Sequence, residues 1–421
     1  MINKDLTADN DPNDPRTCWK VKFNFRRFNM NTKISAAVAS AALVLGATTA
    51  NAGIIIPAGE WTLDVNGNVN VYATMQKFDD TNTNNTVAGG LAGYEDANGE
   101  SNNQSINTGL LPAWLGFTGT TRQNDLDVSF TISMQPNVSE NAAAGDDVTP
   151  KWRQAFLTFG DKSWGTVKMG KDLGIFAGQA ILNDMTLLGV GSGYSNSGTK
   201  TTLGGIGTGY IYPAWKGQIS YTTPNMNGFS ATIGITNPNQ VGNAGTGVTS
   251  YQDRFGVEAQ AMYEFAAGKI WVSGASYDVT DGSANYDAEA IDIGATVGFG
   301  NASVTAYYYT GDGAGATLFG ANGYDTTTGT RDSAGGYVQA TYVIPSGTKL
   351  GVAYGVSTLD ANSGETDSTL LDENKRWTVG AYHPLTKHLN LVAEYNNTTS
   401  EAQGSNEAES QALSLGAILF F

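Results

Sequence analysis

The chain contains long stretches in which apolar and polar residues alternate. In the first, Trp61–Met75, apolar side chains occupy one parity, and Asn, Asp and Thr side chains occupy the other. A period of two residues is typical of a β-strand with one apolar and one polar face. The same pattern returns at 229–236, 254–265, 291–299, 376–381 and 389–396. The sequence therefore predicts an all-β protein.

The connections between these strands alternate between short and long. Short connections lie near 121–124, 160–164, 224–227, 266–268, 300–302, 345–348 and 383–387. Long polar connections lie near 79–105, 136–150, 172–210, 238–252, 280–288, 312–334, 360–372 and 399–408. These boundaries predict sixteen strands, seven tight turns and eight long loops. An antiparallel up-and-down sheet gives this order when all turns lie at one end and all loops at the other.

The two faces of the strands favour a membrane barrel over a soluble sheet. Most strands have about ten residues of apolar alternation, the length that a tilted strand needs to cross a bilayer. The other face carries mid-strand charges, which need water: Asp64, Arg254, Glu258, Asp292, Arg376 and Glu394. The alternating segment Gln411–Phe421 ends on an aromatic residue, as a closing strand at a lipid interface would. We therefore expect a closed transmembrane β-barrel, which leaves no strand edge unpaired.

The N-terminal region has the features of a secretory signal peptide. Between residues 30 and 52, a short basic start and an Ala-rich apolar run precede the small-x-small site Ala50–Asn51–Ala52. We expect cleavage after Ala52. We interpret 1–29 as a non-native upstream extension and 53–421 as one barrel domain. A transmembrane helix is the alternative, but the apolar run is short and a cleavage site follows it directly.

Loss of residues 1–52 would change the charge and the cysteine content. This segment holds seven Lys/Arg and four Asp/Glu, so 53–421 keep 16 basic and 35 acidic residues, a net charge of −19, and lose Cys18. An exported chain without cysteine is not a disulfide scaffold. Such acidity argues against nucleic acid as a partner and suits the attraction of cations.

The residues for metal or covalent chemistry are sparse. The acidic loops match no defined calcium-loop motif. The only histidines, His383 and His388, flank a single turn. A nucleophilic site would need a histidine beside its nucleophile. We therefore expect no metal, no cofactor and no enzymatic activity.

Three motifs give the chain a resemblance to the general Gram-negative outer-membrane porins: Leu115–Gly119 (LGFTG), Arg153–Leu157 (RQAFL) and Trp164–Asp172 (WGTVKMGKD). The segment Asn183–Met185 (NDM) adds to them, and the resemblance extends over 53–421. It implies a trimer of sixteen-stranded barrels in which the third long loop folds into the lumen. In that family an acid on this loop faces basic side chains on the opposite wall. The field between them sorts solutes by size and charge.

The third long loop also has features of its own that favour an inside position. It runs for nearly forty residues after Lys171, and structureless loops of such length are usually functional. It carries a small apolar patch that can pack against the inner wall, formed by Ile181, Leu182, Met185, Leu187 and Leu188.

Carried over to this chain, the resemblance gives five candidates for the pore constriction: Trp114, Arg153, Lys168, Lys171 and Asp184. Arg153 matches a wall arginine, Lys171 stands where an arginine is usual, and Asp184 matches the loop acid. The family often has a second loop acid, where this chain has Leu188, and a basic residue, where it has Trp114. The three cations could instead be solvated charges on the polar face. Trp114 could stack on sugar rings or belong to an interfacial girdle.

These observations lead to a hypothesis of passive diffusion. The chain would form a water-filled outer-membrane channel for small hydrophilic solutes and ions, after export through the periplasm. Its acidity and the lack of a base at Trp114 predict a weak cation preference. A channel selective for sugars or oligosaccharides and a non-conducting structural or adhesive barrel remain alternatives. The expected partners are outer-membrane lipid, lipopolysaccharide and further copies of the chain in a homotrimer.

Overall fold

A computed structural model of the chain describes residues 53–79, 86–93, 99, 101–136, 138, 151–192, 201–237, 253–281 and 284–421. All of these belong to one compact unit. The predicted extension 1–29 and the predicted signal peptide 30–52 with its cleavage position lie outside the described residues and stay predictions. In the described part of the chain, no helix is long and apolar enough to cross a membrane.

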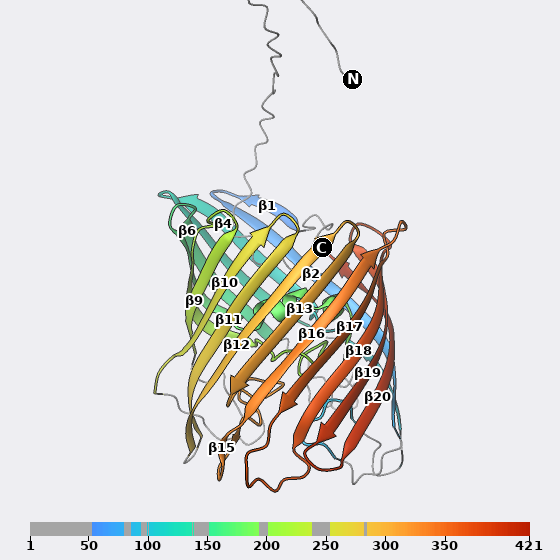
Figure 1. The fold of residues 1–421 in the computed structure, drawn as a ribbon. Helices are drawn as coiled ribbons and strands as arrows, with labels where there is room; N and C mark the ends of the chain where they lie inside the picture. Colours follow the sequence, from blue (N-terminus) through green and yellow to red (C-terminus); the bar gives the residue numbers. More distant parts are fainter. Residues whose placement is uncertain are drawn as a thin grey trace, which may run out of the picture. The chain divides into compact units, whose positions relative to one another are not determined.

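One antiparallel sheet of eighteen strands holds most of the described chain (Figure 1). Its strands are β1 (Ile54–Ala58), β2 (Trp61–Phe78), β3 (Asn102–Asn107), β4 (Trp114–Gln123), β5 (Leu126–Gln135), β6 (Lys151–Asp161), β7 (Gly165–Leu173), β8 (Trp215–Thr222), β9 (Phe229–Thr236), β10 (Gly256–Phe265), β11 (Gly268–Asp281), β12 (Ala284–Phe299), β13 (Ala302–Asp312), β16 (Asp332–Val343), β17 (Lys349–Leu359), β18 (Leu371–Pro384), β19 (Leu389–Ala402) and β20 (Glu407–Phe420). A small hairpin, β14 (Tyr324–Asp325) and β15 (Gly329–Thr330), follows β13. The connection from β7 to β8 contains α2 (Gly178–Asn183) and the 3₁₀ helix η3 (Met185–Leu188).

Strand β2 closes the sheet into a barrel because it pairs with strands from both ends of the chain. One edge of β2 pairs with β4 over 62–68 and with β3 over 72–77. The other edge pairs with β1 over 61–65 and with β20 over 68–78. Each edge therefore holds two strands in tandem, and the eighteen strands fill sixteen positions around the barrel. The predicted closed, sixteen-stranded antiparallel barrel is confirmed.

The alternation along the strands separates an apolar outer face from a polar inner face. On β2, Val69 and Met75 are exposed, whereas Asn68, Asn70 and Thr74, on the other parity, are buried. The exposed apolar side chains recur on strand after strand around the barrel. Exposure of so many apolar side chains to water would be unfavourable, but lipid removes that cost. The outer face therefore has the composition of a lipid-facing surface.

Two predicted long loops are mostly strand, and these two predictions are wrong. β11 runs to Asp281 and β12 begins at Ala284, so strand replaces most of the predicted loop 280–288. The pairing of β19 with β20 likewise continues to Glu401↔Glu407, inside the predicted loop 399–408. Most residues in both places are polar, but the ladder joins backbone groups, which pair whatever the side chains are. The polar residues show where the apolar band of the outer face ends, but the strands continue beyond that band.

An ion pair joins two of the long connections at the loop end of the barrel. Arg331 Nε donates to both carboxylate oxygens of Glu365 at 3.0 Å, and Nη2 donates to Oε2 at 2.7 Å. Asn362 Nδ2 also donates to the carbonyl oxygen of Thr330 at 2.7 Å. The bidentate geometry makes this contact stronger than an ordinary surface ion pair.

Acid is expected to loosen this contact between the loops. The hydrogen bonds from Arg331 hold the pKa of Glu365 below its usual value. For a carboxylate with a depressed pKa, the stabilisation is full above its ordinary pKa of about 4.3 and is lost as pH falls through the lower folded-state pKa. We expect hydrogen exchange of 362–367, corrected for intrinsic rates, to accelerate below about pH 4. Glu365→Gln should remove this pH dependence, and an unchanged profile in that variant would contradict the assignment.

Candidate functional site

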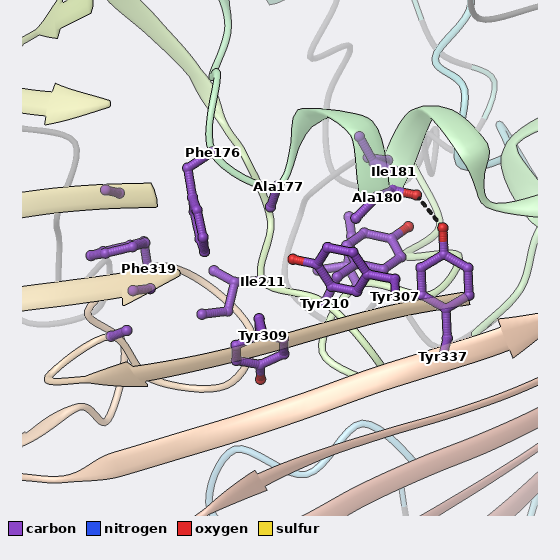
Figure 2. Packing of buried hydrophobic residues seen from close by; sticks show 14 of the residues in the cluster. Phe176, Ala177, Ala180, Ile181, Tyr210, Ile211, Tyr307, Tyr309, Phe319 and Tyr337 are labelled. Carbon is purple, nitrogen blue, oxygen red and sulfur yellow. Dashed lines mark hydrogen bonds between the residues drawn. The ribbon is translucent and has the colours of Figure 1, made fainter. Parts of the chain in front are cut away.

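The third long connection, 174–214 between β7 and β8, packs against side chains of the barrel strands. We call it the third loop; its described parts are 174–192 and 201–214. Most of its buried apolar side chains belong to one cluster with aromatic residues of the wall. Figure 2 shows Phe176, Ala177, Ala180, Ile181, Tyr210 and Ile211 of the loop with Tyr307, Tyr309 and Tyr337 of the wall. Trp271 and Tyr277 belong to the same cluster. Tyr337 also donates its hydroxyl to the carbonyl oxygen of Ala180 at 2.8 Å. Of the predicted apolar patch, Ile181 and Leu187 are buried in this cluster and Leu182 packs against it.

Buried carboxylates on the wall accept hydrogen bonds from the loop backbone near its start. Glu258 on β10 accepts from the N–H groups of Ile175 at 2.6 Å and Phe176 at 3.1 Å. Asp292 on β12 accepts from the N–H group of Ala177 at 3.1 Å. A charged acceptor strengthens such bonds, and burial makes them costly to lose.

The later part of the loop is attached in the same manner on other strands. Glu394 on β19 accepts from the N–H groups of Val190 at 2.9 Å and Gly191 at 2.8 Å. Gln339 on β16 accepts from the N–H group of Met185 at 2.8 Å. The loop is thus fixed at several points by side chains from β10, β12, β16 and β19.

Each wall carboxylate also has a partner on the wall itself. Lys216 Nζ donates to Glu258 Oε1 at 2.6 Å, and these side chains are 3% and 0% exposed. Tyr307 donates its hydroxyl to Asp292 at 3.1 Å. Tyr382 donates its hydroxyl to Glu394 at 2.6 Å. Both oxygens of each carboxylate therefore accept hydrogen bonds from protein donors, which lie on the wall and on the loop.

Asp184, the candidate loop acid, is buried, and its carboxylate accepts hydrogen bonds from donors within the loop. Its Oδ1 accepts from the backbone N–H of Thr186 at 2.9 Å and from the Thr186 hydroxyl at 2.8 Å, which caps η3. Its Oδ2 accepts from Gly205 N–H at 2.9 Å and from the Tyr210 hydroxyl at 2.8 Å. Burial raises the pKa of Tyr210 well above its usual value, and Asp184 raises it further. The Tyr210 hydroxyl therefore remains a donor.

Trp114 begins β4 on the inner face. Its Nε1 donates to Asn66 Oδ1 at 3.2 Å, and its ring meets Phe420 edge-on with centroids 6.4 Å apart. The ring packs against a buried cluster that contains Tyr72, Val190, Tyr382, Val392, Ile418 and Phe420. The structure therefore places Trp114 in an apolar contact at the edge of the third loop.

Arg153 and Lys168 belong to neighbouring strands. Arg153 lies at a β-bulge, because Ser133 pairs with Gln154 and the next residue, Met134, pairs with Trp152. Burial raises the pKa of Tyr212 in the third loop, and the nearby charge of Arg153 opposes that rise. Lys168 Nζ donates a hydrogen bond to the carboxylate of Asp172, which lies on the same face of β7. The same Nζ lies 5.1 Å from the ring centroid of Phe156. The structure thus brings Arg153 close to the loop and pairs Lys168 with an acid.

Lys171 points to the outer face of the barrel. It shares the parity of Met169, which is exposed on the outer face, and it is itself exposed. Its Nζ donates to the carbonyl oxygen of Trp152 at 3.2 Å. The motif that carried Lys171 spans both faces of β7, and alternation alone decides which of its residues point inwards.

Hydroxyl groups pair across the inner face of β4–β9. Thr118 and Thr131 lie 3.1 Å apart, oxygen to oxygen. The corresponding distance between Ser129 and Thr158 is 2.6 Å, and between Thr222 and Thr232 it is 2.9 Å. This part of the wall presents neutral hydrogen-bonding groups.

Sequence reasoning missed the role of Glu258, Asp292 and Glu394. It identified them as mid-strand charges on the polar face and assigned water as their partner. The structure gives them the backbone N–H groups of the third loop instead. The sequence contained one usable signal: acids in the middle of strands together with a long Gly-containing loop. Backbone N–H groups of such a loop need acceptors wherever they are buried.

The comparison with protein families agrees with this architecture. A family model described as Gram-negative porin matches residues 39–403. The chain belongs to the Gram-negative porin family. This porin is therefore a channel of the outer membrane. No curated protein sequence matches the chain.

Solved structures of outer-membrane proteins share the fold of this porin at low sequence identity. The channel DcaP of Acinetobacter baumannii is 14% identical with a TM-score of 0.66, over 88% of this chain and 100% of that one. An anion-selective porin from Comamonas acidovorans is 15% identical with a TM-score of 0.62, over 86% and 100%. OmpF of Salmonella typhi in complex with daunomycin is 16% identical with a TM-score of 0.57, over 87% and 100%. Such identities carry the fold and leave solute selectivity open.

Proposed function

We propose that this porin lets small hydrophilic solutes and ions diffuse passively through a water-filled lumen that the third loop enters and narrows. The observation that carries the proposal is the attachment of one loop to inner-face side chains on strands far apart around the barrel. Glu258 on β10 and Glu394 on β19 both bind it, and Tyr72 on β2 donates its hydroxyl to the carbonyl oxygen of Leu188 at 2.7 Å. A segment outside a closed barrel could not reach all three.

The open path then lies between the third loop and the strands β4–β9. Arg153, Lys168 and Trp114 stand beside that path in the proposal, and Lys171 does not. Most of the path is neutral, because Lys168 has an acid partner and the hydroxyl pairs carry no charge, and Arg153 adds one positive charge beside it. The cation preference is accordingly weak and arises from the net charge of −19 over 53–421.

Conductance across a planar bilayer under a salt gradient tests this function. We expect ohmic conductance and a zero-current potential that indicates a slight excess of cation flow. Arg153→Ala should shift that potential further towards cations, because it removes a positive charge beside the path. Protein that inserts without conducting would contradict the channel, and a preference for anions would contradict the assigned selectivity.

We further propose that the signal peptide is cleaved after Ala52 during export. The mature chain then forms a homotrimer surrounded by outer-membrane lipid and lipopolysaccharide. The exposed apolar side chains of the outer face support contact with lipid. Transport by diffusion requires no covalent chemistry, and we propose none.

A further inference from the structure

The barrel wall is interrupted between β3 and β4. Pairing with β2 ends at Tyr72↔Asn107 and resumes at Asn68↔Trp114. Three residues of β2, 69–71, therefore stand opposite six residues, 108–113. We call 108–113 the inward segment, because the extra length leaves the ladder and is almost entirely buried.

Two buried asparagines of β2 hold the inward segment by its backbone. Asn70 Oδ1 accepts from Gly109 N–H at 2.8 Å, and Asn70 Nδ2 donates to the carbonyl oxygen of Leu111 at 2.9 Å. Asn68 Nδ2 donates to the carbonyl oxygen of Pro112 at 2.9 Å. Both asparagines are 1% exposed. Side-chain amides thus supply the hydrogen bonds that a neighbouring strand would otherwise make.

The inward segment also pairs, backbone to backbone, with the third loop. Leu110 N–H donates to the carbonyl oxygen of Gly189 at 2.9 Å, and Leu111 N–H donates to that of Leu187 at 3.2 Å. A Cβ atom at Gly109 would stand 2.2 Å from the Gly189 oxygen, so this approach requires glycine. The inward segment and the third loop therefore form one hydrogen-bonded unit at this point.

We infer that the inward segment, positioned by Asn68 and Asn70, sets the narrowest cross-section of the channel jointly with the third loop. The inference rests on the proposed function, in which the third loop lies in the lumen. Glu394 holds Val190 and Gly191 from the β19 side, and the inward segment holds Leu187 and Gly189 from the β2 side. Asn68 and Asn70 are positioning residues: their side-chain amides bind the inward segment and do not contact solute, so they affect the size limit only through the segment.

Asn70→Ala tests the inference in single-channel recordings of the full-length protein. For each buried hydrogen bond that is lost, the fraction of recording time that the channel spends at a higher conductance level should rise about fivefold. The size limit, measured by exclusion of polyethylene glycols, should rise with it. Thr74→Ala is the matched control. Thr74 lies on the same strand and face but bonds to Ser414, away from the inward segment.

Two further variants keep the test decisive if Asn70→Ala fails to fold. Asn68→Ala removes the bond to Pro112, and Gly109→Ala forces the inward segment away from Gly189. Both should widen the channel, whereas loss of thermal stability without widening would indicate a purely structural role and overturn the inference. A conducting wild type whose size limit is unchanged in the folded variants overturns the inference alone. A wild type that does not conduct overturns the proposed function itself.

Discussion

Lys216→Met is expected to destabilise the barrel by about 3–5 kcal/mol, the cost of breaking a buried ion pair by removal of one partner. Lys216 and Glu258 are 3% and 0% exposed, and their ion pair spans 2.6 Å. Methionine fills most of the volume of lysine but leaves the Glu258 carboxylate without its cation. The free energy of unfolding, measured by denaturant titration of the protein in detergent or lipid, checks the prediction.

Two comparisons make this prediction specific. Lys162→Met, in the exposed turn between β6 and β7, should change stability by no more than about 0.5 kcal/mol. The double variant Lys216→Met with Glu258→Gln should recover part of the loss, because it removes both charges and leaves an acceptor for the loop amides. If the double variant is less stable than Lys216→Met alone, the ion pair is not the source of the loss.

Much of the fold follows from period-two alternation, because the barrel exposes one face of each strand to lipid. Trp61–Met75 predicted β2 on this basis, and β2 proved to be the strand that closes the barrel. Alternation failed where the apolar band gives no signal. β3 is the largely polar segment NNQSIN, and its first four residues fell inside the predicted loop 79–105. Backbone pairing forms strands outside the regular apolar alternation as well, and side-chain polarity does not reveal them.

The site was less predictable than the fold, because side-chain partners across a barrel leave no local pattern in the sequence. The resemblance matched Asp184 to a loop acid that faces basic side chains of the wall, and it did not reveal that this carboxylate accepts from Thr186, Gly205 and Tyr210. Parity could identify the inward residues of a regular strand. It could not follow the bulge at Arg153, which arises from the register with β5.

The wall carboxylates add contacts that the resemblance did not imply. The acids stand on the wall and the donors are backbone N–H groups of the loop. A side-chain acceptor on the wall can be removed by mutation without altering the backbone of the loop. Among the wall acids, Glu394 is the one that binds Val190 and Gly191.

Glu394→Ala is expected to release residues 187–191 and to widen the channel. Glu394 Oε2 accepts from the N–H groups of Val190 and Gly191 at 2.9 and 2.8 Å. Each buried N–H that loses its acceptor costs about 1–3 kcal/mol, so the attached state loses about 2–6 kcal/mol. Even the lower limit shifts the balance between attached and released loop by about thirtyfold. Single-channel conductance and the polyethylene glycol size limit should both rise.

Glu394→Gln separates the lost acceptor from the lost charge. The glutamine oxygen can still accept from Val190 and Gly191, and its amide can donate to the Tyr382 hydroxyl, which now donates to Glu394 at 2.6 Å. Conductance in this variant should therefore stay close to that of the wild type, while Glu394→Ala widens the channel. Equal widening in both variants would mean that the negative charge holds the loop. No widening in either would mean that the bonds on the β2 side suffice.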